Sequence, residues 1–363
     1  MGESAAPGFV SLGDLEEAAS RVVPPEAWLY VQSGAAGEDS MRANRDAFRR
    51  RTLRPRVLAD VSTIDLSTTL LDATVSAPVF VCPMARQGLL HPDGELATAR
   101  AVARGELLGT FSTLSTRSPE EIASAAPDGL RWFQIYLQPE FSRTQELVER
   151  AEKAGYSALI LTVDTPLLGV RDRLAATPFV LDPEHALGAG VGVRAPARSP
   201  SGGRGRYTLR ADAAATWTVL DDLQSITRLP VVVKGILTGE DARRAVAHGA
   251  RAVLVSNHGG RQLDAAEAAL ERLPEVVRAV GSDVEVYFDS GIRRASDALV
   301  ALALGARAVG LGRPVLWALA VGGQAGVDRL LSLFTSELAS TMALTGRRRI
   351  GEIDRTLLGE PRW

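Results

Sequence analysis

The sequence has few of the features on which several classes of protein depend. It contains a single cysteine, Cys82, so no intrachain disulfide can form. It has no apolar run of about 18 residues or more, which a membrane-spanning helix would need. The first fifteen residues lack a basic stretch followed by an apolar one, so we expect no secretory signal. These absences favour a cytoplasmic protein with no membrane partner.

The chain also lacks an excess of charge of either sign. Its 41 basic and 43 acidic residues leave a formal net charge of −2, so no global basicity indicates a nucleic-acid partner. Hydrophobic residues make up 46% of the chain, which predicts a globular protein with a substantial core. An anionic ligand would therefore have to be bound by locally placed arginines.

Three segments repeat one pattern of a helix end, a glycine and a short apolar strand. They are AEKAGYSALILTVD at 151–164, AVAHGARAVLVSN at 245–257 and ALALGARAVGLGR at 301–313. Glycine after a last helical turn can adopt the left-handed conformation that ends a helix. Repetition of such units predicts α/β structure with a closed parallel barrel. The length of 363 residues suits one (β/α)8, or TIM, barrel with extensions.

Eight apolar runs are candidates for the strands of this barrel. They are Pro78–Met84, Leu108–Leu114, Trp132–Tyr136, Ala158–Val163, Pro230–Lys234, Ala252–Ser256, Val284–Asp289 and Ala306–Leu311. Helical patterns separate most of them, for example at Glu240–His248 and Ala295–Leu304. Polar residues gather where the strands end, which is where barrel enzymes carry their sites.

We predict a single domain over 1–363 with two regions outside the repeat. Residues 1–77 form an N-terminal helical extension, whose first helix is capped by Ser11 and Asp14. The barrel covers 78–345. Residues 172–215 form a lid insertion after the fourth strand, because this long stretch is rich in Ala, Gly, Arg and Pro and lies at the catalytic face.

The segment SNHGGRQLD at 256–264 places an imidazole and a guanidinium three residues apart after the sixth strand. His258 could accept a proton from a substrate. Arg261 could hold a carboxylate through two parallel hydrogen bonds. The other histidines, His91, His185 and His248, lack such neighbours, and we interpret them as structural.

Two further strand ends carry candidate site residues. Asp164 ends the fourth strand and either hydrogen-bonds to His258 or caps the next turn. Arg171 either holds a carboxylate or lies solvated in the lid. Alternation in FQIY sends Gln134 and Tyr136 to the same side of the third strand, where they meet a ligand or fill a layer of the barrel.

The last strands indicate a phosphate site. Lys234 ends the fifth strand, and a lysine inside a barrel needs an anionic partner. DSGIR at 289–293 and GLGRP at 310–314 follow the seventh and eighth strands. Glycines there let backbone N–H groups approach an anion, and these two loops are the usual phosphate grip of TIM barrels. The pair predicts a phosphorylated cofactor or substrate.

These motifs resemble the FMN-dependent 2-hydroxy acid oxidases and dehydrogenases, a family that includes glycolate, lactate and hydroxymandelate oxidases. SNHGGRQLD is the family signature, and it occurs here with YVQSGA, RPRVL, HPDGELATARA, FQIY, LTVDTP, VVKGI and GRPV in the expected order. The resemblance runs from about Ser11 to about Arg349. It implies a TIM barrel, FMN as cofactor, and oxidation of an L-2-hydroxy acid to the 2-keto acid.

The resemblance also implies a role for each site residue. Around the substrate it places His258 as proton acceptor, Asp164 as partner of that histidine, Arg171 and Arg261 on the carboxylate, and Tyr30 and Tyr136 as hydrogen-bond donors. Around FMN it places Pro83, Met84, Ala85, Ser112, Gln134, Thr162, Lys234, Ser256, Asp289, Ser290, Gly291, Arg293, Gly312 and Arg313. No metal is implied. Family members commonly form tetramers or larger assemblies, so we expect a homo-oligomer, a tetramer or an octamer.

Four positions depart from the family pattern. Met84 and Leu114 stand where glycolate oxidases have threonine and tryptophan. Leu114 predicts a more open, apolar pocket, which favours an apolar or aromatic, mandelate-like substrate over glycolate. Ser290 stands where glycine is frequent, a change that the loop tolerates if its backbone keeps its shape. Val170 replaces a frequent arginine, and the lid beyond it diverges.

Ala85 near the flavin favours oxygen as the electron acceptor, with H2O2 as product. One alternative is a dehydrogenase that uses another acceptor. A second is an FMN-dependent barrel isomerase, for which the combination of His258, Arg261 and Arg171 would not be needed. A third is a barrel scaffold without activity. Hydride transfer and a carbanion route would use the same residues.

Overall fold

Eight parallel strands close into a barrel in the computed structural model, which describes residues 9–175 and 213–360. Their order around the barrel is β10-β3-β4-β5-β6-β7-β8-β9, so the last strand pairs with the first. All eight coincide with predicted apolar runs, and the predicted TIM barrel is confirmed. The strands are β3 Val79–Val81, β4 Leu108–Ser112, β5 Arg131–Ile135, β6 Ala158–Thr162, β7 Val231–Ile236, β8 Ala252–Val255, β9 Glu285–Phe288 and β10 Ala308–Leu311.

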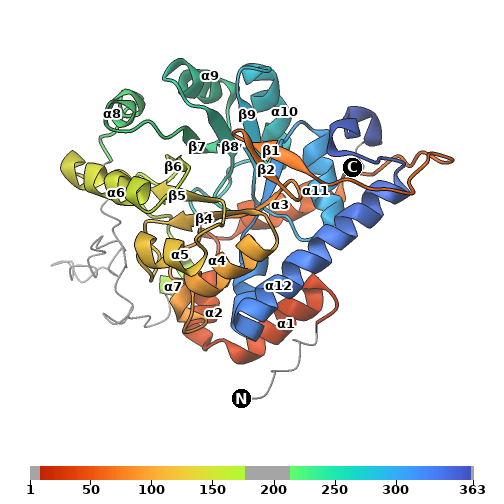
Figure 1. Ribbon diagram of the computed structural model, residues 1–363, viewed down its shortest axis with the longest axis horizontal. Coiled ribbons are helices and arrows are strands. Elements are labelled where there is room, and N and C mark those ends of the chain that lie inside the picture. Colours follow the sequence, from red (N-terminus) through yellow and green to blue (C-terminus); the bar gives the residue numbers. More distant parts are fainter. Residues whose placement is uncertain (1–8, 176–212, 361–363) are drawn as a thin grey trace.

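Helices alternate with the strands and surround the barrel (Figure 1). Capping residues define several starts; Ser118 and Glu121 form a capping box on α5, for example. The last helix is bent at Gly322 and Gly323, whose backbone is not helical. The helices are α4 Glu95–Arg104, α5 Pro119–Ala125, α6 Phe141–Lys153, α7 Asp172–Ala175, α8 Val219–Ile226, α9 Gly239–Ala247, α10 Ala269–Val280, α11 Ala295–Ala303 and α12 Arg313–Leu344, with a short 3-10 turn η1 at Gln87–Leu89.

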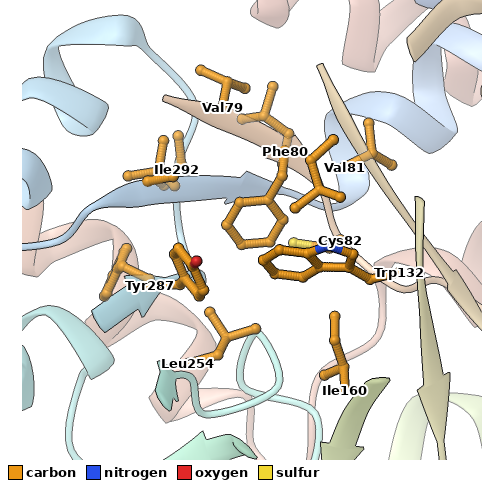
Figure 2. Packing of buried hydrophobic residues seen from close by; sticks show 14 of the residues in the cluster. Val79, Phe80, Val81, Cys82, Trp132, Ile160, Leu254, Tyr287 and Ile292 are labelled. Carbon is orange, nitrogen blue, oxygen red and sulfur yellow. The ribbon is translucent and has the colours of Figure 1, made fainter. Parts of the chain in front are cut away.

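Aromatic side chains fill the barrel interior (Figure 2). The Tyr287 ring centroid lies 6.1 Å from that of Phe80 and 5.5 Å from that of Trp132. Gly310 leaves room for this layer, because a Cβ at that position would lie 2.5 Å from the Cys82 Sγ and 2.6 Å from the Phe80 ring. The large rings thus fill the interior of the barrel below the carboxyl ends of the strands.

The N-terminal extension packs three helices on the barrel: α1 Leu12–Val22, α2 Pro25–Gln32 and α3 Asp39–Arg49. The predicted cap of α1 is confirmed, since the Ser11 side chain accepts a hydrogen bond from the Asp14 N–H. Figure 1 shows α1 beside the long α12. An antiparallel hairpin of β1 Thr68–Leu70 and β2 Ala73–Val75, which the sequence analysis did not predict, completes the extension.

The chain end returns to the extension through the 3-10 turns η3 Ile350–Glu352 and η4 Arg355–Leu357. Leu358 pairs with Leu53, and Arg349 pairs with Asp65. Most of the predicted lid, 172–215, lies outside the described residues. Its first four residues form α7.

Candidate active site

A cavity of about 490 Å³ opens at the carboxyl ends of the barrel strands, where α2 also contributes to its wall. Sixteen of the predicted site residues line it: Tyr30, Pro83, Met84, Ala85, Ser112, Tyr136, Arg171, Lys234, His258, Arg261, Asp289, Ser290, Gly291, Arg293, Gly312 and Arg313. The other four lie behind its wall, with Thr162, Gln134 and Ser256 buried and Asp164 partly buried. The barrel therefore gathers residues from all eight strand ends and from the extension around one space.

His258 and Asp164 form a partly buried pair at one side of this cavity, and His258 lines it. The His258 Nδ1 lies 2.9 Å from Oδ1 of Asp164. Burial lowers the pKa of His258, and the Asp164 carboxylate opposes this only in part. Burial acts to raise the pKa of Asp164, but the charges of His258 and Lys234 outweigh it and lower that pKa to about 2. The imidazole is thus neutral near pH 7 and can accept a proton, with a carboxylate ready to stabilise the cation.

The carboxyl end of α2 fixes the guanidinium of Arg261. The Arg261 Nη1 donates to the carbonyls of Val31 at 3.0 Å and Ser33 at 2.7 Å, and Nη2 donates to that of Tyr30 at 3.0 Å. Free carbonyls at a helix end carry partial negative charge, so they stabilise a buried cation there. Arg313 uses the same feature, because its Nε donates to the Val31 carbonyl at 3.1 Å.

Arg171 and Arg261 approach the same Tyr30 ring. Their Cζ atoms lie 6.0 Å and 5.6 Å from its centroid. Burial lowers the pKa of both guanidinium groups, and within the described residues neither forms an ion pair. The Arg171 Nε is buried with no hydrogen-bond partner there. Two partly buried cations with no described carboxylate between them form a site for an anionic ligand.

Beside the His258 pair, polar side chains lie in the cavity wall and directly behind it. Gln134 accepts a hydrogen bond from the Ser112 hydroxyl at 2.7 Å, and its Nε2 is buried without a partner among the described residues. Burial acts to lower the pKa of Lys234, but the carboxylates of Asp289 and Asp164 raise it overall, so this lysine stays charged. A donor amide and a cation placed this way suit the carbonyl edge of a flavin ring.

The loops after β9 and β10 carry the residues that were predicted to bind a phosphate. Burial, followed by repulsion from Arg313, lowers the pKa of Arg293 to about 9. Burial, followed by repulsion from Arg171, lowers the pKa of Arg313 to about 10. Neither forms an ion pair with a described carboxylate. Ser290 keeps a φ of 92°, a conformation that glycine usually occupies, so the loop keeps a glycine-like shape around a serine.

Two residues that hold this site were not predicted. Asn44 on α3 and Asn257 exchange side-chain hydrogen bonds of 2.8 and 2.9 Å. Gln262 donates to the carbonyls of Asp164 and Leu167, which joins the loop after β6 to the loop after β8. Gln262 lies inside SNHGGRQLD and could have been found there. Asn44 gave no signal, because its partner lies 213 positions away.

The residues present fit FMN. The cavity has apolar walls for a ring system, the Lys234 ammonium for its polar edge and, behind the wall, the Gln134 Nε2 with no partner among the described residues. For the phosphate it has the partly buried Arg293 and Arg313, neither of which forms an ion pair with a described carboxylate. No group of three or more His, Cys, Asp or Glu side chains in the described ranges could hold a metal ion. Across these ranges no helix combines the length and hydropathy that crossing a bilayer requires.

Known proteins resemble the chain over almost all of its length. It is 47% identical to an L-lactate oxidase of a Nostoc species over 361 residues, which cover 96% of this chain and 98% of that protein. It is 44% identical to glycolate oxidase 1 of Zea mays over 340 residues, 93% of this chain and 92% of that protein.

Solved structures give the same result. The crystal structure of a mandelate oxidase superposes with a TM-score of 0.87 at 42% identity and covers 97% of this chain and 98% of its own. The family model described as FMN-dependent dehydrogenase matches residues 19–360. The predicted FMN cofactor and oxidoreductase class are thereby confirmed. The chain belongs to the FMN-dependent dehydrogenase family.

Proposed function

We propose that the protein oxidises an L-2-hydroxy acid, the (S) enantiomer in simple cases, to the 2-keto acid. One observation carries this proposal: His258, paired with Asp164, lines the same cavity as Arg171 and Arg261, two partly buried cations without an ion-pair partner among the described residues. A proton acceptor next to a carboxylate site suits a substrate with a hydroxyl group beside its carboxylate. The relatives named L-lactate, glycolate and mandelate oxidase support the same reaction class.

Each residue around the substrate then has a defined task. Arg171 and Arg261 hold the carboxylate and so orient the molecule. His258 accepts the hydroxyl proton, and Asp164 stabilises the imidazolium that results. Burial, followed by the charge of Asp164, raises the pKa of Tyr136 to about 12, so its hydroxyl stays protonated and donates a hydrogen bond to the substrate.

The chemistry that bound FMN supplies is acceptance of the two electrons that leave the substrate. Lys234 and Gln134 bind the polar edge of its ring, where negative charge increases on reduction. Arg293, Arg313 and the backbone of 290–293 bind its phosphate. Ser112, Thr162 and Pro83–Ala85 would contact the ring, and Ser256 and Asp289 would lie near the phosphate.

The substrate side chain is apolar or aromatic in this proposal, as in mandelate. Met84, Leu114, Leu168, Val170 and Leu174 are among the residues that line the cavity. A hydrophobic wall of this kind favours a ring or a branched chain over the bare hydrogen of glycolate. The similarity to a mandelate oxidase structure supports this choice.

Oxygen is the electron acceptor in the same proposal, with H2O2 as product, because Ala85 lies at the cavity wall and the named relatives are oxidases. We also propose that the chain acts as one domain in a cytoplasmic homotetramer or larger homo-oligomer. The one free cysteine is buried and fits a reducing compartment.

The test is a product assay with a panel of 2-hydroxy acids: glycolate, which is achiral, and both enantiomers of lactate and of mandelate. The proposal predicts equal amounts of 2-keto acid and H2O2 in air, with (S)-mandelate turned over faster than glycolate. Keto acid formed only with an artificial dye would identify a dehydrogenase with another acceptor. Binding of FMN with no keto acid from any member of the panel would refute the proposal.

A further inference from the structure

Three consecutive backbone N–H groups around His258 are held by two serine hydroxyls. The N–H of His258 donates to the Ser256 Oγ at 3.0 Å. The N–H groups of Asn257 and Gly259, one on each side, both donate to the Ser290 Oγ, at 3.3 and 3.1 Å. Ser256 belongs to the same loop, whereas Ser290 comes from the loop after β9. The backbone on both sides of the catalytic imidazole therefore depends on a residue of the phosphate loop.

Both hydroxyls are oriented by one carboxylate oxygen. The Oδ1 of Asp289 accepts from Ser256 at 2.6 Å and from Ser290 at 2.9 Å. Lys234 lies 3.6 Å from the other oxygen of Asp289 and donates to Ser256 at 2.9 Å. All four side chains are buried. The Ser290 hydroxyl thus donates once and accepts twice, which uses its full capacity for hydrogen bonds.

The backbone at both ends of this contact is in a rarely populated conformation. His258 has a φ of 58° and Ser290 a φ of 92°. A non-glycine residue keeps such an angle only where its surroundings hold it there. Glycine would adopt the angle at position 290 without strain, but it would offer no oxygen to Asn257 and Gly259.

We propose that Ser290 is a positioning residue, which fixes the backbone on both sides of His258 and couples it to the loop that binds the FMN phosphate. The inference rests on the proposed function of His258. It predicts that a phosphate bound at 290–293 orders the loop at 256–262 through this one hydroxyl.

Two substitutions separate the hydroxyl from the backbone angle. Ser290→Ala removes the oxygen and keeps the Cβ, and Ser290→Gly removes both and relaxes the strain. Ser67→Ala is the matched control, because Ser67 also donates to a nearby aspartate, Asp65, at 2.6 Å but lies exposed and far from the cavity.

The first readout is anaerobic flavin reduction in the FMN-loaded proteins. Both Ser290 variants should lower the limiting reduction rate by about ten-fold to a hundred-fold, since a small misplacement of the base is costly. The apparent dissociation constant of the 2-hydroxy acid should change by less than about three-fold, because Arg171 and Arg261 remain in place. A general loss of folding would change both quantities and the melting temperature.

The second readout is hydrogen–deuterium exchange with and without FMN, which needs no turnover. FMN should slow exchange at 256–262 in the wild type and in Ser67→Ala. In both Ser290 variants this protection should be lost, while protection at 289–293 remains.

Wild-type rates and wild-type protection in Ser290→Ala would overturn the inference. Exchange at 256–262 that does not respond to FMN in the wild type would also overturn it. If no 2-hydroxy acid reduces the wild-type flavin, the proposed function fails, and the exchange readout still decides whether Ser290 couples the two loops.

Discussion

Opposing effects of its surroundings set the pKa of His258. Burial and the nearby Lys234 favour the neutral imidazole, and Asp164 favours the cation. The net result is a pKa below the ordinary value of 6.5. A base must be neutral to accept a proton, and the neutral form predominates above its pKa.

The pH profile of the reaction therefore has a defined direction. We predict that kcat/KM stays level as the pH falls from 8 to about 6.5 and declines only below that value. Asp164→Asn should move this decline to still lower pH, because it removes the charge that raises the pKa of His258. It should also slow turnover by about ten-fold to a hundred-fold, through loss of a charge-assisted hydrogen bond. If kcat/KM already began to fall at a pH above 7 as the pH was lowered, this account of His258 would be contradicted.

Arg171 should act on binding more than on chemistry. Arg171→Met keeps an unbranched apolar chain about as long as the aliphatic part of the arginine and removes the charge that faces the cavity. We predict that the dissociation constant of the 2-hydroxy acid, from anaerobic titration, rises by about ten-fold to a hundred-fold. FMN binding should stay unchanged in the same samples. Unchanged substrate affinity would mean that Arg171 does not contact the carboxylate.

At the scale of elements, α3 holds both functional loops against the barrel. Asn44 pairs with Asn257 in the catalytic loop, and Arg45 donates to the Gly291 carbonyl in the phosphate loop. The approach is so close that a Cβ on Gly260, whose φ is 75°, would lie 2.6 Å from the backbone nitrogen of Met41. The extension is thus part of the site and not only a cover on the barrel.

Asn44→Ala tests this role of α3. It removes the oxygen that accepts from the Asn257 amide and from the Ala269 N–H, and leaves the Asn257 amide only the Glu267 carbonyl. We predict a loss of about 1–3 kcal/mol in the free energy of unfolding. Urea denaturation of the FMN-free protein measures it, with the exposed Ser67→Ala as the neutral comparison. A change no larger than that of the control would show that the pair does not stabilise the contact.

The strands were predictable from sequence and the hairpin was not, for a physical reason. A barrel strand such as β7 is covered on both faces, so Val231–Val233 form an apolar run that stands out. In β1 and β2, three residues each, only the last is buried, and such short strands show no period. The contacts of Asn44 and of the α2 carbonyls join residues more than two hundred positions apart, which no local pattern reports.

At the scale of the whole molecule, the cavity concentrates unbalanced charge. Arg171, Arg261, Arg293 and Arg313 are all held around it, and burial lowers the pKa of each. A ligand that carries a phosphate relieves this repulsion. Binding to the folded state alone must then stabilise the protein.

FMN removal should accordingly lower the melting temperature. At free FMN one hundred times its dissociation constant, the stabilisation is about 2.7 kcal/mol, which calorimetry registers as a rise of several degrees. Riboflavin, which lacks the phosphate, should stabilise less at equal concentration. Equal stabilisation by both ligands would contradict the assignment of Arg293 and Arg313 to the phosphate.

The central claim is that His258 accepts a proton from a 2-hydroxy acid held next to FMN. The most direct measurement compares anaerobic flavin reduction by (S)-mandelate in the wild type and in His258→Ala, both loaded with FMN. The account predicts rapid bleaching of the wild-type flavin and a rate lower by about two to four orders of magnitude in the variant. Bleaching of the variant at the wild-type rate would contradict it.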